Sequence, residues 1–289
     1  MDHKATRSHQ AMCAAQAVAR RNGIPSQRSR VVHDSNNVVV HLAPSPVMAK
    51  VCPSTAGCGR SKLAAELDAA VHLERVGAPI VGPSQELSVE VHEEDGYAIT
   101  FWRHQAHDPQ AIVPEVAAAE ALAEVHRALD TFTAPTRSFM DRQVRRTAEI
   151  LANPMSLRAL SNSERSFLTA EYLAVISSVR DRRFECQALH GDPHRGNVLV
   201  AENGCLLIDF ESICSGPLEW DLSALPGAGA GVFAVDDELL LLLRKLRSLC
   251  VAVWCWSRPH LIAELERAAR THLNWLRESQ HSRHQLAAA

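Results

Sequence analysis

The sequence predicts an α+β fold in two lobes, with a small N-terminal antiparallel β-sheet that carries one helix and a larger, mainly helical C-terminal part. Short β-like runs separated by turn residues fill roughly the first hundred residues. Helical periodicity dominates the remainder. The chain has 289 residues, which is long for a single core, and 46% of them are apolar. We therefore expect two lobes, residues 1–102 and 103–289.

The N-terminal lobe is predicted from alternating apolar runs and the turns between them. An alanine-rich helix is expected over residues 5–21, and the helix that covers the sheet over residues 61–76. Asp95-Gly96 is a hairpin signal. Five runs are expected to pair into the antiparallel sheet: residues 28–33, 38–42, 47–51, 87–92 and 97–101.

The C-terminal lobe is predicted from apolar residues at helical spacing. The strongest pattern covers residues 113–129. Ser163 is a candidate N-cap for a later helix, because serine side chains accept hydrogen bonds from the first free amides of a helix. The other expected helices cover residues 139–151, 163–179, 236–257 and 259–277.

Composition argues against several partners. Net charge is −3 and the isoelectric point is near 6.6, so there is no basic surplus to attract nucleic acid. The apolar run 239–256 contains Arg244, Lys245 and Arg247, each costly at a bilayer centre, so we expect a buried helix rather than a membrane span. Eight cysteines occur without a CxxC pair and mostly within apolar runs, which indicates reduced thiols in a cytoplasmic protein.

A polar group precedes and follows a second predicted hairpin. Asp192 and Asn197 lead into the apolar run 198–200, Asn203-Gly204 is a turn signal, and Asp209 follows the next apolar run. The ribbon would hold these three side chains near one of its ends. Carboxylate and amide oxygens are ligands that Mg²⁺ accepts together with phosphate oxygens. The spacing is also that of a protein-kinase catalytic loop followed by its metal loop.

Two other interpretations of this segment stay open. His190 and His194 are four residues apart and flank Asp192, as in a zinc site or a metal-dependent hydrolase. The HxxxH zinc motif needs a helix, which Pro193 and Gly196 oppose. An ordinary β-hairpin with a polar entrance explains the strands but does not explain three magnesium-type ligands at kinase spacing.

The motifs themselves resemble the aminoglycoside phosphotransferase family of small-molecule kinases. They are His190-Gly191-Asp192-x-His194-x-x-Asn197, then Ile208-Asp209-Phe210-Glu211, and later Gly216-Pro217-Leu218-Glu219-Trp220-Asp221-Leu222. The resemblance implies a protein-kinase-like fold with a nucleotide-binding lobe over 1–102. It places the catalytic loop and the acceptor site in the helical lobe over 103–289.

The resemblance also implies roles for the residues of these motifs. Asp192 would be the catalytic residue that accepts a hydrogen bond from the acceptor hydroxyl and takes its proton. Asn197 and Asp209 would hold Mg²⁺ against the phosphates. His194 and Arg195 lie beside the reacting centre and are candidate contacts to phosphate or acceptor. Glu211 stands where protein kinases have glycine, and is a candidate to assist the metal or to contact a cationic acceptor.

Lys50 is the candidate that orients the nucleotide phosphates. A lysine on the apolar run 47–51 is unusual unless it has a partner. In kinases a lysine on the third strand contacts the α- and β-phosphates and pairs with a glutamate on the following helix. Glu66 is the favoured partner, with Asp68 and Glu74 as competitors. The alternative is an edge-strand lysine exposed to water.

The remaining nucleotide contacts are expected in a loop and at a hinge. Ser35, Asn36 and Asn37 occupy the position of a phosphate-covering loop, which here contains no glycine. Asparagine is the residue type next most able to adopt positive φ, and a plain hairpin turn is the alternative. Phe101 and Trp102 are expected at the hinge that lines the adenine pocket, with simple packing as the alternative.

The activity implied is transfer of the γ-phosphate of ATP, or of GTP, to a hydroxyl of a small acceptor. We expect a polyhydroxylated and cationic acceptor, with an aminoglycoside-type antibiotic as the leading candidate. A metabolite such as choline or homoserine is the alternative acceptor. A pseudokinase that binds nucleotide without turnover is the other class of protein that the sequence leaves open.

Overall fold

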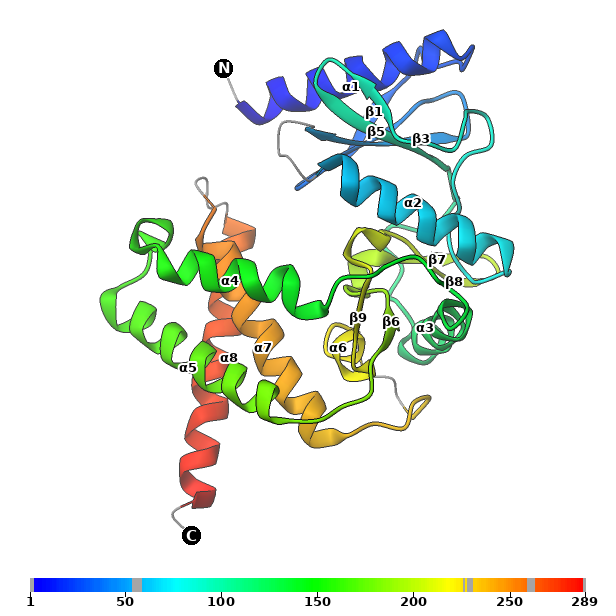
Figure 1. Ribbon diagram of the computed structural model, residues 1–289. Coiled ribbons are helices and arrows are strands. Elements are labelled where there is room, and N and C mark those ends of the chain that lie inside the picture. Colours follow the sequence, from blue (N-terminus) through cyan, green and yellow to red (C-terminus); the bar gives the residue numbers. More distant parts are fainter. Residues whose placement is uncertain (1–2, 54–58, 226, 228–230, 259–262, 288–289) are drawn as a thin grey trace. The chain divides into compact units, whose positions relative to one another are not determined.

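The computed structural model describes residues 3–53, 59–225, 227, 231–258 and 263–287. Contacts within the chain define two compact units (Figure 1). The first comprises Met1–Pro135 and His190–Ile213, and the second comprises Thr136–Leu189 and Cys214–Ala289. The segment that carries the catalytic motif thus groups with the sheet, and the division into lobes at residues 102 and 103 stays a prediction.

The first unit is built on a five-stranded antiparallel sheet of strand order β1-β2-β3-β5-β4. Its strands are β1 (Arg30–Asp34), β2 (Val38–His41), β3 (Val47–Pro53), β4 (His92–Glu94) and β5 (Tyr97–Arg103). Asp95 and Gly96 both take positive φ, 48° and 77°, and close the β4–β5 hairpin as predicted. Together with the helices, the sheet confirms the predicted α+β class.

Each face of this sheet carries a helix. Both helices were predicted, but only the second was expected to cover the sheet. Along β3, Val47, Ala49 and Val51 point to one side, where they pack with α1 (His3–Arg21) in a single buried cluster. Lys50 lies between them in the strand and points to the other side, which α2 (Gly59–Arg75) covers. Figure 1 shows α1 and α2 on opposite sides of the strands.

The fourth strand was predicted wrongly over residues 87–92. The observed β4 begins at His92, and residues 87–91 form bends instead of strand. Ser88 closes a local turn there, because its carbonyl accepts from the Glu90 amide at 3.0 Å and its hydroxyl donates to the Glu90 carboxylate at 2.7 Å. Local side-chain hydrogen bonds of this kind compete with ladder pairing.

A two-stranded ribbon completes the first unit. It consists of β7 (Val198–Ala201) and β8 (Gly204–Leu207), as the turn signal predicted. The segment that follows α2 anchors the ribbon: the Leu207 amide donates to the Pro79 carbonyl at 2.9 Å, and the Val81 amide to the Leu207 carbonyl at 3.2 Å. The helix α3 (Glu115–Leu129) also packs against β8. Residues that follow β8 are thereby fixed relative to α2.

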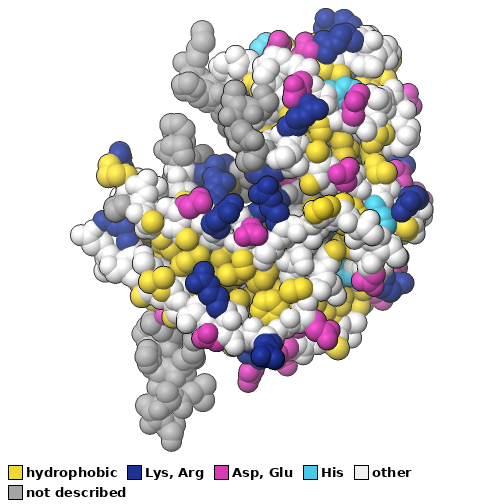
Figure 2. Space-filling view, viewed as in Figure 1, with side chains coloured by type: hydrophobic (Ala, Val, Ile, Leu, Met, Phe, Trp, Pro, Cys, Tyr) yellow, Lys and Arg dark blue, Asp and Glu magenta, His cyan; other side chains and the backbone are white. Residues whose placement is uncertain are grey.

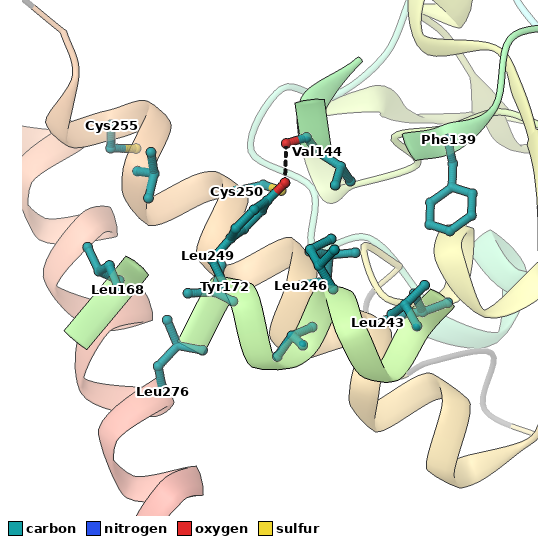
Figure 3. Close-up of a cluster of buried hydrophobic side chains, with 14 of the residues drawn as sticks. Phe139, Val144, Leu168, Tyr172, Leu243, Leu246, Leu249, Cys250, Cys255 and Leu276 are labelled. Carbon is teal, nitrogen blue, oxygen red and sulfur yellow. Dashed lines mark hydrogen bonds between the residues drawn. The ribbon is translucent and has the colours of Figure 1, made fainter. Parts of the chain in front are cut away.

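The second unit is mainly helical around one apolar core. Tyr172 lies in that core and donates its hydroxyl to the Val144 carbonyl at 2.9 Å, so its polar atom is satisfied (Figure 3). The predicted buried helix after residue 236 is present as α7, and residues 259–262 of the last predicted helix lie outside the described ranges. The elements are α4 (Gln143–Ala152), α5 (Asn162–Asp181), β6 (Gln187–Leu189), β9 (Cys214–Gly216), α6 (Leu218–Leu222), α7 (Asp237–Trp256) and α8 (Ala263–Ala287).

The N-cap of α5 differs from the prediction by two residues. Ser161, not Ser163, caps the helix: its hydroxyl accepts from the Glu164 amide at 3.2 Å, and the Glu164 carboxylate accepts from the Ser161 amide at 3.0 Å. This reciprocal capping box satisfies two amides, whereas a cap at Ser163 would leave Glu164 without that role.

Two observations concern membrane-spanning helices and the distribution of surface charge. No helix among the described residues is long and apolar enough to cross a membrane. On the face drawn in Figure 2, acidic and basic side chains are interspersed rather than separated by sign.

Candidate active site

Lys50 lies at the centre of a group of three acids in the first unit, of which one is buried and two are half-buried. Its Nζ donates to both carboxylate oxygens of Glu66, at 2.9 and 2.8 Å, and to Asp209 Oδ1 at 2.7 Å. Glu211 Oε2 lies 3.5 Å away. Lys50 is 7% exposed and Glu66 is 1% exposed. Lys50 therefore contacts Glu66, its expected partner. The alternative, that Lys50 is an edge-strand lysine exposed to water, is excluded.

The competing partners of Lys50 lie elsewhere on α2. Glu74 pairs with Arg103 at the end of β5, and Asp68 is exposed. Glu66 reaches Lys50 because it projects from the buried face of α2 toward the middle of β3. The backbone hydrogen bonds between Leu207 and the segment after α2 then bring Asp209 to the same point. Asp209 itself takes φ 66° and ψ 62°, a left-handed conformation that aspartate tolerates better than most residues.

The cluster holds three acids for one ammonium. Burial lowers the pKa of Lys50, but Glu66, Asp209 and Glu211 together outweigh it and raise that pKa above its ordinary value. Burial raises the pKa of Glu66 to about 7 against the lowering effect of Lys50, with Asp209 and Glu211 adding to the rise. Burial also disfavours the Asp209 anion, yet Lys50 holds the pKa of Asp209 below its usual value. The excess of negative charge leaves the site able to take up a further cation.

The side chain of Asn197 is hydrogen-bonded to the backbone of Asp192, the candidate catalytic residue. Asn197 donates its side-chain amide to the Asp192 carbonyl at 2.9 Å, so its amide oxygen is the atom of this side chain that could ligate a metal. The Ile208 amide donates to the Asn197 carbonyl at 3.0 Å, so the residue before Asp209 is held beside Asn197. The structure thus brings Asp192, Asn197 and Asp209 into one hydrogen-bonded segment.

Gly191 permits a close approach between the segment of Asp192 and the segment that follows Asp209. Its φ is +91°, and a Cβ atom on it would lie 1.9 Å from the Ser212 carbonyl oxygen. No side chain fits at that distance from backbone. Glycine in the His-Gly-Asp motif is therefore a packing requirement of this fold.

The histidines of the motif do not form a zinc site in this conformation. His190 uses both ring nitrogens, Nε2 with the Ile208 carbonyl at 3.0 Å and Nδ1 with the Asp192 amide at 3.3 Å. His194 accepts from the Gly196 amide through Nδ1 at 3.0 Å, and its Nε2 lies 3.9 Å from Asp192 Oδ2. His190 therefore supports the loop, and its nitrogens are not available to a metal.

The donor set fits a hard divalent cation better than zinc. Among the described residues, the group of side chains at metal-ligand spacing consists of Glu66, Asp209 and Glu211, whose ligand atoms lie within 4.8 Å of one another. Asn197, whose carbonyl accepts from the Ile208 amide, is the residue predicted to add a neutral oxygen. Oxygen-only ligands with excess negative charge suit Mg²⁺ or Ca²⁺. Glu211, which the sequence left between two roles, belongs to this acidic cluster.

The three predicted loop residues have different surroundings. Ser35 and Asn36 are exposed, and the Ser35 hydroxyl bonds to His33 Nε2 at 2.8 Å. Asn37 is buried and donates its amide to Glu211 Oε2 at 2.8 Å. The loop is therefore linked to the acidic cluster through Asn37, while Ser35 and Asn36 face solvent.

The two residues predicted at the hinge, Phe101 and Trp102, point to opposite sides of the sheet. Phe101 pairs with Ala49 in the ladder and is buried in the cluster that includes α1, so its ring is a core side chain. Its carbonyl accepts from the Ser84 amide at 3.0 Å. Trp102 lies on the side of Lys50 and donates its indole N–H to Thr100 at 2.9 Å. Contact of Trp102 with a nucleotide stays a prediction.

These features define a class of protein. A lysine on the third strand, paired with a glutamate on the following helix and adjoining the motif of Asp192, Asn197 and Asp209, is the organisation of kinase-like phosphotransferases. The sequence matches the Phosphotransferase enzyme family over residues 32–278. The chain belongs to that family.

Solved structures of kinases share the fold at low sequence identity, which confirms the predicted protein-kinase-like fold. Amicoumacin kinase hAmiN, in complex with AMP-PNP, Ca²⁺ and Ami, has a TM-score of 0.69 and 11% identity, over 94% of this chain and 96% of that chain. The GDP and kanamycin complex of APH(2")-IIia has a TM-score of 0.65 and 15% identity, over 93% of this chain and 98% of that chain.

A third similar structure widens the range of acceptors among neighbours. A choline/ethanolamine kinase family protein from Mesorhizobium loti has a TM-score of 0.61 and 16% identity, over 92% of this chain and 94% of that chain. A comparison with curated proteins gives no match. Identities this low establish the fold and leave the acceptor to be argued from the site.

Proposed function

We propose that the protein is a small-molecule kinase that transfers the γ-phosphate of a nucleoside triphosphate, with ATP as the leading candidate, to a hydroxyl of a small acceptor. The observation that carries this proposal is the contact of the buried Lys50 with Glu66 and Asp209, beside the segment of Asp192 and Asn197. Such a site supplies positioning and charge neutralisation, which are the main demands of phosphoryl transfer.

Each residue has a defined part in the proposed reaction. Lys50 orients the α- and β-phosphates and is itself held by Glu66. Asp192 accepts a hydrogen bond from the acceptor hydroxyl, whose oxygen forms the new bond to the γ-phosphorus as the bond to the β–γ bridging oxygen breaks. The hydroxyl proton passes to Asp192, and the nucleoside diphosphate leaves with the bridging oxygen. Asn197 and Asp209 would hold Mg²⁺, which would supply neutralisation of phosphate charge.

The acceptor proposed is a polyhydroxylated, cationic small molecule, with an aminoglycoside-type antibiotic as the leading candidate. The similar structures include kinases solved with kanamycin and with spectinomycin. Modification of such a compound would make this an antibiotic-resistance enzyme. Its proposed location is the cytoplasm. A metabolite alcohol such as choline or homoserine is the second candidate, supported by the similarity to the choline/ethanolamine kinase family protein.

The test is acceptor-dependent release of nucleoside diphosphate. Purified protein with Mg²⁺ and ATP, or GTP, is assayed against a panel of aminoglycosides, other hydroxylated antibiotics, choline and homoserine. We expect release with at least one cationic polyol, and a phosphorylated product by mass spectrometry. Asp192→Asn is expected to lower turnover by about two to four orders of magnitude, the range for a positioned general base.

The outcomes separate the alternatives. Near-wild-type turnover in Asp192→Asn would remove that residue from the catalytic role. Nucleotide binding that depends on Mg²⁺, without acceptor-dependent release across the panel, would favour a pseudokinase. Stoichiometric zinc in the purified protein would favour a metal-dependent hydrolase.

A further inference from the structure

The N-terminal helix α1 holds the loop between β1 and β2 from outside the sheet. Arg7 donates through Nη1 to the Ser35 carbonyl at 2.9 Å and through Nη2 to the Asn36 carbonyl at 2.8 Å. These are two successive carbonyls of the loop expected to cover the nucleotide phosphates. The family match begins at residue 32, so this helix precedes the matched region.

Asp34 fixes Arg7 in this position. Its Oδ1 lies 3.3 Å from Arg7 Nη1, and its Oδ2 accepts from the Ser8 hydroxyl at 2.5 Å. The Asp34 side chain is 6% exposed, and its Oδ1 accepts no hydrogen bond from any described residue. The Arg7 charge therefore compensates a nearly buried carboxylate at the end of β1. Because the same carboxylate accepts from Ser8 on α1, it holds the guanidinium beside the loop.

The same loop is held from inside by the acidic cluster. Asn37 donates to Glu211 Oε2 at 2.8 Å, and that oxygen lies 3.5 Å from Lys50 Nζ. The three loop residues thus have Arg7 on one side and Glu211 on the other. The loop contains no glycine, so it lacks the conformational freedom that lets glycine-rich loops adapt to phosphates.

We propose that Arg7 is a positioning residue for nucleotide binding, which sets the shape of the β1–β2 loop through its two carbonyl contacts. The proposal rests on the nucleotide-binding role proposed above for the Lys50 cluster. A planar guanidinium suits the task because its fork reaches two acceptors at a fixed spacing. A loop already ordered before binding loses less conformational entropy when the nucleotide binds.

The test compares Arg7→Ala with Arg21→Ala in the full chain. Arg21 lies at the other end of α1 and pairs with Glu94 on β4, so its removal breaks an ion pair of the same helix without touching the loop. ATP binding is measured by calorimetry with and without Mg²⁺. We expect Arg7→Ala to weaken binding of ATP with Mg²⁺ about tenfold, which corresponds to about 1.4 kcal/mol, and Arg21→Ala to leave it unchanged.

Two further readouts separate positioning from general destabilisation. Arg7→Ala should keep the full gain in ATP affinity on adding Mg²⁺, because the metal-binding residues remain in place. Hydrogen exchange of a peptide spanning residues 31–40 should rise in Arg7→Ala and not in Arg21→Ala. Arg7→Lys should restore binding only in part, since one ammonium cannot copy the fork. If Arg7→Ala does not fold, Asp34→Asn loosens the same contact and should shift affinity in the same direction.

The results that would overturn the proposal are distinct. Equal ATP affinity of wild type and Arg7→Ala, or equal weakening in Arg21→Ala, would overturn it and leave the kinase assignment standing. Loss of the Mg²⁺-dependent gain would identify a collapsed site and also overturn it. A wild-type chain that binds neither ATP nor GTP would overturn the proposed function, and this proposal with it.

Discussion

Replacing Lys50 with methionine is expected to destabilise the first unit by an amount that grows with pH. Methionine keeps most of the side-chain length and removes the ammonium that contacts Glu66 and Asp209. At pH 6 Glu66 is mainly protonated, since its pKa is about 7, so the chief loss is the contact with Asp209. A hydrogen bond between charged groups contributes about 1.5–3 kcal/mol, which sets the expected loss at that pH.

The pH dependence follows from the sign of the Glu66 shift. Its pKa in the folded protein, about 7, lies above the unfolded value of 4.5. An acid with a raised pKa stabilises the folded state fully below the unfolded pKa, and this contribution is lost as pH rises through the folded pKa. Without Lys50 the folded pKa rises further, so the variant keeps losing stability above pH 7 where the wild type no longer does. One proton difference corresponds to about 1.4 kcal/mol per pH unit.

The expected difference between two pH values is therefore specific. From pH 7 to pH 8.5 the extra loss is about 2 kcal/mol, which brings the cost of Lys50→Met to about 3–5 kcal/mol, the range for breaking a buried ion pair. Lys50 holds the pKa of Asp209 below its usual value in the wild type, and the variant loses this effect. The cost of Lys50→Met is therefore measured in the background of Asp209→Asn, which leaves Glu66 as the acid that titrates. The cost should stay level between pH 5.5 and pH 6.5.

The assay is hydrogen exchange under increasing urea, read on peptides from β3 and α2. Peptides from α7 in the second unit serve as an internal reference within the same molecule. Arg103→Met is the matched control, since its pair with Glu74 is half exposed and should contribute little at either pH. Equal losses at pH 6 and pH 8.5, or a greater loss at pH 6, would refute the assignment of the titrating acid to Glu66.

Three further predictions follow from the site. Asp209→Ala should abolish the gain in nucleotide affinity on adding Mg²⁺, because it removes a hard anionic ligand; titration with and without the metal measures this, and a full gain in the variant would exclude Asp209 as a ligand. Gly191→Ala should lower the melting temperature and abolish turnover, because its Cβ would meet the Ser212 carbonyl at 1.9 Å. Gly204→Ala is its control, since φ there is +121° but no described atom beyond its two chain neighbours lies within 4 Å of the added Cβ. Equal effects of the two substitutions would mean that backbone strain, and not the contact with Ser212, causes the loss. If the acceptor is cationic, its affinity should fall as ionic strength rises, and binding of neutral or anionic acceptors that is unaffected by salt would defeat that expectation.

The features predicted well from the sequence are local. The ribbon β7–β8 was expected from two apolar runs around Asn203-Gly204, and its strands are as predicted. The two-residue turn is Glu202-Asn203, one position earlier, because Gly204 is the first residue of β8 and pairs with Ala201. The position of Asp209 after β8 follows from the same register. The pairing of Lys50 with Glu66 is not local in this sense, but α2 directly follows β3, and a short connection restricts which helix face can reach the strand.

The features that sequence reasoning missed depend on distant pairings. Arg7 is one of several charged residues on an alanine-rich helix, and nothing in its spacing indicates that it contacts a loop near residue 35. Asn37 and Glu211 are 174 residues apart, and their contact requires both the register of β2 and the conformation after β8. The β4 error has another origin, because the local turn at Ser88 competed with an apolar pattern that looked like a strand.

These missed contacts connect the β1–β2 loop, predicted to cover the phosphates, with the Lys50 cluster. Arg7 holds the loop backbone, Asn37 links the loop to Glu211, and Glu211 adjoins Lys50. Both contacts of Glu211 engage Oε2, and a carboxylate has about four lone-pair positions on two oxygens. Glu211 is therefore able to keep its bond to Asn37 while Oε1 serves a cation. The loop does not have to leave the acidic cluster for a metal to enter it, so a loop without glycine is compatible with the phosphate site proposed here.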